Sequence, residues 1–184
     1  MNIDILKELL FSSDWQDIQD MLNETMRTKI LWVVTSSGAS ILKSEENYHQ
    51  LCQLIRDSRE GLRRCQNSHH GRFQEAKRTG RPVLSVCYCG LMCFAVPIKL
   101  DGKLIGLAGG NIPQSEFPMT VEKCAEISVA CGLDVKEIME YAKGIKHISK
   151  AEQKQALNQL SILAGMLPPL LKWMYKALTP NVTL

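Results

Sequence analysis

Apolar residues recur at helical spacing in the first part of the chain. They return every three or four positions from Ile5 to Leu10 and from Trp15 to Met26, which predicts two amphipathic helices. The same spacing runs from Tyr48 to Ile55 and from Cys65 to Arg78. Thr79–Pro82 then ends the pattern, because glycine and proline interrupt a helix.

Strand-like runs, rich in β-branched and aromatic residues, fill the middle of the sequence. The runs are Ile30–Thr35, Ala39–Leu42, Val83–Ile98 and Lys103–Gly109. We expect a break near Gly90 in the longest run and a hairpin turn at Asp101-Gly102. Helical spacing then resumes, and the helices expected there are 121–131, 135–142 and a long one that begins near residue 149.

Hairpin-like strands, separated by one helical insertion, favour an antiparallel sheet over a parallel doubly wound one. The predicted fold class is therefore α+β, with helices on one side of the sheet and flanking N- and C-terminal helices. A chain of 184 residues is compatible with one domain. We expect residues 1–184 to form it, with N-terminal helices over residues 1–28, a core over 29–118 and C-terminal helices over 119–184.

Composition fits a folded protein, since 45% of the residues are hydrophobic and 22% are charged. The net charge is only +3 and the basic residues are scattered, so no direct contact with nucleic acid is expected. The N-terminus lacks the features of a secretory signal, which predicts a cytoplasmic protein. The apolar segment Leu160–Leu178 contains Pro168-Pro169 and Lys172, so no membrane span is predicted there.

Cysteines are the most unusual chemistry of the chain, which has seven of them. Cys87, Cys89 and Cys93 surround Gly90 within a strand-like run, and Cys65 precedes them. On a regular strand, the first three would point to one face because their positions share parity. In a reducing compartment, such thiols are more often ligands, redox groups or buried apolar side chains than disulfides.

Two interpretations of these four thiols stay open. In the first, they are small apolar residues that line a cavity; in the second, they form a metal or redox site, as ligands for zinc or an iron–sulfur cluster or as a redox pair. The C-x-C-x3-C spacing is not a standard metal-binding pattern. His69 lies one helical turn after Cys65 and could add a nitrogen ligand, whereas Cys52, Cys124 and Cys131 fit packing positions.

No enzyme is expected from the motifs. Leu104–Asn111 is glycine-rich but lacks the G-x-G-x-x-G spacing and a Walker lysine, and no G-x-S-x-G elbow occurs. A thiol oxidoreductase is a third hypothesis, because Arg63-Arg64 lies beside Cys65 and a nearby cation can lower the pKa of a thiol.

Residues from Ile30 to about Ser115 resemble the PocR sensory domain, a PAS-like ligand-binding module of bacterial transcription regulators and signalling proteins. The resemblance rests on the order of its pieces: Trp32–Gly38, Leu51–Arg56, Gly61–Cys65, the Cys87 segment with Gly90-Leu91 and Ala95–Ile98, the Asp101-Gly102 turn, and Ile105-Gly106 through Gly109-Gly110. It implies a PAS-like antiparallel sheet. No output domain is recognisable, so the chain is expected to be an excised or a stand-alone sensor.

The resemblance also implies a function in regulating transcription or signalling. The ligand class would be short hydrocarbon derivatives such as diols, held between the sheet and the helices of residues 46–78. Cys52, Cys65 and Cys87 match positions where the family often carries cysteine. Tyr88-Cys89 and Cys93 depart from the family pattern, which favours a sulfur-rich pocket.

We therefore expect a small-molecule pocket with apolar walls, a tyrosine hydroxyl and glycine clearance. Its predicted residues are Trp32, Cys65, Cys87, Tyr88, Cys89, Met92, Cys93, Leu107 and Gly109. The alternative is a metal or redox sensor that uses Cys65, Cys87, Cys89 and Cys93 for zinc or an iron–sulfur cluster. Amphipathic helices at both ends predict a homodimer, while the output partner cannot be identified from the sequence.

Overall fold

The computed structural model describes residues 12–26, 29–35, 40–43, 49–100, 102–111, 119–145 and 148–178. Its helices are α2 (Ser13–Met26), α3 (Gln50–Asp57), α4 (Arg59–Thr79), α5 (Val121–Cys131), α6 (Val135–Lys143) and α7 (Lys150–Leu178). Its strands are β1 (Lys29–Thr35), β2 (Ser40–Lys43), β3 (Val83–Val86), β4 (Met92–Leu100) and β5 (Lys103–Asn111). The helix expected over Ile5–Leu10 lies outside the described residues. None of the described helices is long and apolar enough to cross a membrane.

The five strands form one sheet in the order β2-β1-β5-β4-β3, and every neighbouring pair is antiparallel. Leu100 pairs with Lys103 across the β4–β5 hairpin, where Gly102 adopts a φ of +77° that suits glycine. The central strand, β5, pairs with β1 on one side and with β4 on the other. The predicted α+β class is confirmed, and the arrangement agrees with a PAS-like sensory fold.

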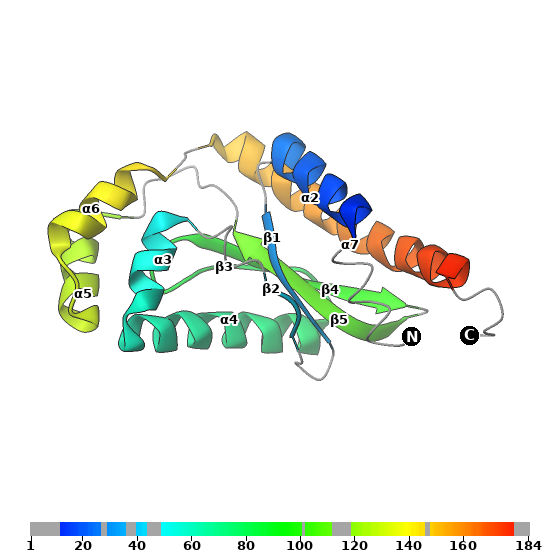
Figure 1. The fold of residues 1–184 in the computed structure, drawn as a ribbon, viewed down its shortest axis with the longest axis horizontal. Coiled ribbons are helices and arrows are strands. Elements are labelled where there is room, and N and C mark those ends of the chain that lie inside the picture. The colour runs from blue at the N-terminus through cyan, green and yellow to red at the C-terminus, as the bar shows by residue number, and fades with distance from the viewer. Residues whose placement is uncertain are drawn as a thin grey trace.

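Helices cover the sheet on two sides (Figure 1). α3 and α4 lie on one side, while α7 packs on β4 from the other side, where α2 also lies. Every residue of β4 from Cys93 to Ile98 is buried, as expected for a strand with both faces covered. On the α4 side, the buried Ala76 and Ala95 meet with Leu107, and their small size lets the helix approach the sheet closely.

Ser58 separates the two helices that face the sheet. Its backbone ends α3, while its Oγ accepts a hydrogen bond from the Gly61 amide at 3.0 Å and so caps α4. A Cβ atom at Gly61 would lie 2.0 Å from the Ile55 carbonyl oxygen. The close approach of α3 to α4 therefore depends on glycine at position 61.

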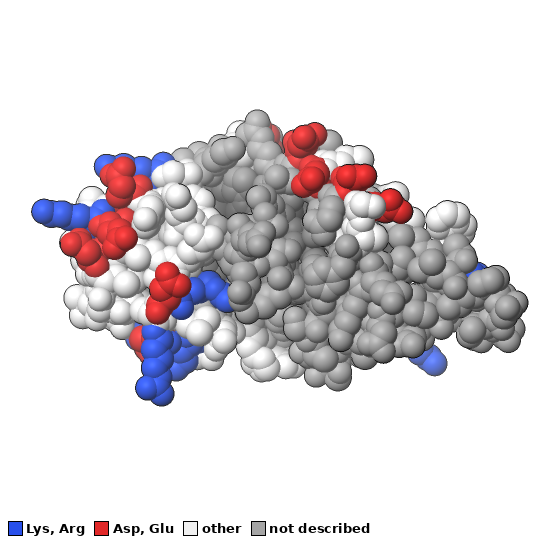
Figure 2. Space-filling model, viewed as in Figure 1, with Lys and Arg blue, Asp and Glu red and all other residues white. Residues whose placement is uncertain are grey.

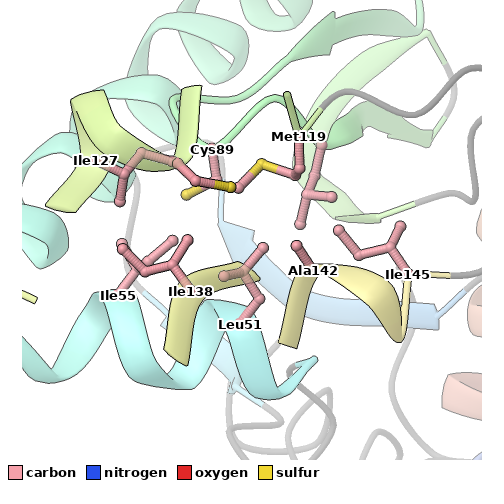
Figure 3. Close-up of a cluster of buried hydrophobic side chains, with 10 residues drawn as sticks. Leu51, Ile55, Cys89, Met119, Ile127, Ile138, Ala142 and Ile145 are labelled. Carbon is pink, nitrogen blue, oxygen red and sulfur yellow. The ribbon is translucent and has the colours of Figure 1, made fainter. Parts of the chain in front are cut away.

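A second packed cluster joins α3 to α5 and α6 beyond one end of the sheet (Figure 3). It comprises Leu51, Ile55, Cys89, Leu91, Met119, Cys124, Ile127, Ile138, Ala142 and Ile145. Acidic and basic side chains intermix over α5 and α6 on the face shown in Figure 2, whereas exposed acidic residues follow α2. Cys89 and Leu91 are the members of this cluster that come from the loop between β3 and β4.

The long strand expected over Val83–Ile98 is in fact two strands. The break expected near Gly90 is a turn over residues 87–91, after which β4 folds back on β3 with Val86 paired to Met92. Gly90 has a φ of +79°, a left-handed conformation that a Cβ would strain. Cys87 and Cys89 therefore belong to a turn and not to a regular strand, so the shared-parity prediction does not apply to them.

Candidate functional site

The turn between β3 and β4 is held at both ends. The Cys87 amide donates to the Leu91 carbonyl at 2.7 Å, and the Gly90 amide donates to the Cys87 carbonyl at 2.9 Å. The Tyr88 amide also donates to Ser68 Oγ on α4 at 3.1 Å. These bonds place the turn against α4, where Cys87 and Cys89 meet the helices.

A small cavity lies between this turn, the sheet and the helices α3 and α4. It is lined by Cys52, Ile55, Arg56, Cys65, His69, Cys87, Cys89, Cys93 and Asn111. Its volume of about 20 Å³ is room for about one water molecule. The lining is mostly sulfur and hydrocarbon, with three polar side chains from α3, α4 and β5.

The thiols of Cys87, Cys89 and Cys93 change one another's pKa values. The Cys89 and Cys93 thiols donate toward Cys87, and the backbone amides of Leu91 and Cys89 also point to it, so the pKa of Cys87 lies well below its usual value. The pKa values of Cys89 and Cys93 rise, because a Cys87 thiolate and burial both keep them protonated. Cys93 Sγ also lies 3.0 Å from Asn111 Oδ1. Cys87 is therefore the thiol of this group that ionises first.

On α3, burial raises the pKa of Cys52 to about 12, so this thiol stays protonated at neutral pH. The Arg56 guanidinium donates to Cys65 Sγ at 3.6 Å, although burial still raises the pKa of Cys65. The two thiols on the helix side of the cavity, Cys52 and Cys65, are thus uncharged.

Basic side chains face the cavity from the helix side. Burial and the positive charges of Arg72 and Arg56 lower the pKa of His69 to about 4, so the imidazole is neutral at pH 7. Arg72 is 3% exposed, and its Nε donates to Ser85 Oγ at 2.8 Å. A buried guanidinium is costly unless something compensates its charge.

All four of the predicted metal ligands, Cys65, Cys87, Cys89 and Cys93, line this cavity. Within the part of the chain that the structure describes, however, no three or more His, Cys, Asp or Glu side chains are arranged to hold a metal ion. A bound metal would require the sulfur atoms to move toward one another.

Tyr88 does not line this cavity. Its ring lies between the Arg64 guanidinium, 5.0 Å from the ring centroid, and the Lys123 ammonium at 5.2 Å. Its hydroxyl is 3.7 Å from Cys131 Sγ, which places it toward α5. In this structure Tyr88 fastens the turn to the neighbouring helices.

Three other predicted pocket residues, Met92, Leu107 and Gly109, are not among those that line the cavity. Leu107 packs with Ala76 and Ala95, the buried Gly109 pairs with Ala95, and Met92 is half-buried at the start of β4. The backbone of Trp32 pairs with Gly109. The side chain of Trp32 lies outside the described residues.

Five residues that line the cavity are absent from the pocket predicted from the sequence. They are Cys52, Ile55, Arg56, His69 and Asn111. Helical spacing carries the signal that finds them. Cys52 and Arg56 are four residues apart on α3, and Cys65, His69 and Arg72 follow one stripe of α4. Such a stripe can be identified only once the helix face turned to the sheet is known.

Comparison with known proteins finds a family match for this chain. A family model described as "Sensory domain found in PocR" matches residues 8–169. Over 60 residues, the chain is 32% identical to the regulatory protein PocR of Salmonella typhimurium, a match that covers 33% of this chain and 20% of that protein. The chain thus matches about a fifth of the length of this curated relative. No solved structure matches.

Proposed function

Because this chain belongs to the PocR sensory-domain family, we propose that it is the small-molecule-binding part of a regulator and that the cysteine-lined cavity is its ligand site. The observation that carries the proposal is the position of the cavity. It lies between the sheet and the helices α3 and α4, and its lining comes from both helices, the turn, β4 and β5. A ligand there would touch each of these elements at once.

The chemistry of the lining supports a short hydrocarbon derivative, such as the diols that the family resemblance implies. Ile55 and the neutral thiols offer apolar contact, while Arg56, His69 and Asn111 offer polar atoms for an oxygen. Room for about one water molecule means that the ligand is small and that the lining side chains must move apart to admit it.

A population shift would carry the signal. The cavity side of β4 bears Cys93, and the same strand also contacts α7 on the far side of the sheet. A ligand that binds one arrangement of α3, α4 and the turn more tightly favours that arrangement, by no more than its difference in affinity. α7 would pass this change to a regulatory partner in the cytoplasm, without direct contact with nucleic acid.

We also propose that the domain is a homodimer. Ile162, Met166 and Trp173 on α7 are 61%, 62% and 69% exposed, and their spacing of four and seven residues places them on one helix face. Burial of such a stripe against a second copy of α7 would remove it from water.

Thermal unfolding tests the ligand proposal. Ethylene glycol and 1,2-propanediol are expected to raise the melting temperature, because a ligand that binds only the native state stabilises that state. Cys93→Val should remove the rise. Cys124→Val is the matched control, since Cys124 is equally buried but lies on α5 outside the cavity lining. An equal loss in both variants would contradict binding at the cavity.

A metal or redox sensor is the second candidate, and the observation that favours it is the gathering of five cysteine side chains around one cavity. Zinc or an iron–sulfur cluster would draw Cys65, Cys87, Cys89 and Cys93 together, and loss of metal would loosen the sheet. Anaerobic purification, an absorption spectrum and elemental analysis test this candidate. Stoichiometric metal that disappears in Cys89→Ser and Cys93→Ser supports the metal sensor, and a colourless, metal-free protein contradicts the metal sensor.

We propose no catalytic role for the thiols. The matched family is one of sensory domains. Turnover of a dithiol substrate that is lost when Cys87 becomes Ser would overturn this part of the proposal.

A further inference from the structure

Thiols dominate the lining of the cavity. Five of its nine lining side chains are cysteines, and all five are free thiols. Among the described residues that line the cavity, Ile55 is the only one with a hydrocarbon side chain. A purely apolar pocket needs no sulfur, because aliphatic side chains would fill the same space, and what distinguishes cysteine from them is its reactivity. The lining therefore points to a ligand that reacts with a thiol.

A guanidinium group lies beside one of these thiols. Arg56 Nη1 on α3 donates a hydrogen bond to Cys65 Sγ on α4 at 3.6 Å. Cys65 is half-buried, whereas Cys89 and Cys93 are buried, so a small molecule reaches Cys65 with less movement of the lining. A donor that reaches this sulfur also reaches an oxygen atom two bonds away from it. Cys65 and Arg56 thus offer a nucleophile and a hydrogen-bond donor for one ligand oxygen.

The size of the cavity limits what a non-covalent ligand can achieve. Its volume of about 20 Å³ admits only a molecule of a few atoms. For three non-hydrogen atoms, the best non-covalent ligands reach a Kd of roughly 0.5 mM. A reversible covalent bond to the protein is not subject to this limit. Both the small volume and the abundance of thiols therefore favour a small electrophile.

From these observations we infer that the cavity binds a short-chain aldehyde as a reversible hemithioacetal on Cys65. Cys65 Sγ forms a bond to the carbonyl carbon, the π-electron pair of the C=O bond moves to the oxygen, and the thiol proton ends on that oxygen as a hydroxyl group. Arg56 donates a hydrogen bond to the same oxygen. The thiol, the aldehyde and the adduct are all neutral, so the addition leaves no new charge in the cavity and requires no oxidant.

This inference rests on the proposed ligand site and names its ligand class, since aldehydes are also short hydrocarbon derivatives. Acetaldehyde and ethanol test it, because they have the same number of non-hydrogen atoms and only acetaldehyde is an electrophile. NMR of the wild-type domain with acetaldehyde that carries 13C at the carbonyl position detects the adduct directly. The planar carbonyl carbon becomes a tetrahedral, sulfur-bound carbon with the broad line of a protein, whereas an imine with lysine would keep a planar carbon.

We expect this tetrahedral, protein-bound signal to be saturable. Half-saturation should occur at an acetaldehyde concentration at least about tenfold lower than for N-acetylcysteine, a free thiol measured in the same way, because the cavity orients the reactants and Arg56 binds the oxygen. Ethanol should bind at least about tenfold more weakly than acetaldehyde in thermal unfolding. Dialysis should return the original mass of the protein, since the bond is reversible.

Cys65→Ser should remove the adduct signal, and Arg56→Gln should weaken acetaldehyde binding about tenfold. Cys131→Ser is the matched control, because Cys131 is half-buried like Cys65 but lies on α5 outside the cavity lining. Circular dichroism checks that the variants fold. The comparison of acetaldehyde with ethanol and with N-acetylcysteine needs no variant, so the inference stays testable if Cys65→Ser unfolds. An adduct signal that persists in Cys65→Ser, or that is lost equally in Cys131→Ser, overturns the inference.

The possible results also separate this inference from the proposed function. The absence of a protein-bound tetrahedral carbon, or half-saturation no lower than that of N-acetylcysteine, overturns the aldehyde inference. If 1,2-propanediol still raises the melting temperature in that case, the sensory proposal stands. No adduct together with no response to the diol overturns the inference and also counts against the proposed ligand site.

Discussion

Two glycines of α4 allow a test of how closely this helix approaches α3. A Cβ at Gly61 would lie 2.0 Å from the Ile55 carbonyl oxygen and 2.6 Å from Ser58 Oγ, whereas a Cβ at Gly71 would meet nothing within 4 Å. Both residues belong to the same helix. Gly61→Ala and Gly71→Ala therefore make the same chemical change in two opposite environments.

The structure sets the size of each effect. To reach even 3.0 Å, the Ile55 carbonyl and position 61 must separate by about 1 Å, which would open the contact between α3 and α4 and strain the Ser58 cap. Overpacking and a weakened cap together predict a loss of about 3 to 4 kcal/mol in the free energy of unfolding. Gly71→Ala instead removes a flexible residue from an exposed helix position, which predicts a gain of about 1 kcal/mol.

Urea unfolding followed by circular dichroism measures both changes in the free energy of unfolding, and thermal unfolding measures the melting temperatures. For a domain of this size, the predicted melting temperatures differ from that of the wild type by roughly −10 °C for Gly61→Ala and by roughly +3 °C for Gly71→Ala. Two variants of equal stability would refute the close contact of α3 with α4. The position of Arg56 over the cavity would then lose its structural basis.

Three further predictions concern the cap, pH and assembly. Ser58→Ala should destabilise the domain by about 1 kcal/mol in urea unfolding, because the Gly61 amide loses its acceptor, while Ser58→Asp should keep most of the stability. Since the pKa of His69 falls to about 4 from 6.5, the unfolded state takes up its proton first as the pH drops, so stability should fall by at most about 3 kcal/mol between pH 6.5 and 4. His69→Gln should flatten that part of the pH profile, and a profile unchanged from the wild type would contradict the buried neutral imidazole. Light scattering should give the mass of a dimer for the wild type and of a monomer for Trp173→Glu, and a monomeric wild type at working concentration would contradict the dimer.

Much of the fold could be predicted from local patterns. The helix of Val121–Cys131 and the β4–β5 hairpin follow from apolar spacing and from a glycine turn. The start of α4 was missed, because Arg59–Arg64 is largely polar and only its Ser58 cap and its packing on α3 make it helical. Such a segment shows no apolar periodicity, so the predicted helix began at Cys65.

The candidate site was predictable in part, for a physical reason. Cys87, Cys89 and Cys93 are close in sequence, and a cluster of thiols is visible without a structure. Arg72 was not identified, because an arginine on a helix is usually solvated and nothing in the sequence indicates that Ser85 lies beside it. Long-range contacts of this kind also determine the position of Tyr88, whose ring lies near Arg64 and Lys123 and not at the cavity.

The central claim is that a small ligand binds between the sheet and the helices α3 and α4. A titration of the 15N-labelled domain with 1,2-propanediol, followed by amide NMR shifts, tests this claim most directly. The account predicts saturable shifts at Cys52, Cys65 and the turn of residues 87–91, with smaller shifts along β4 toward α7. The absence of saturable shifts at these positions, or their concentration on the exposed side of α5, would contradict it.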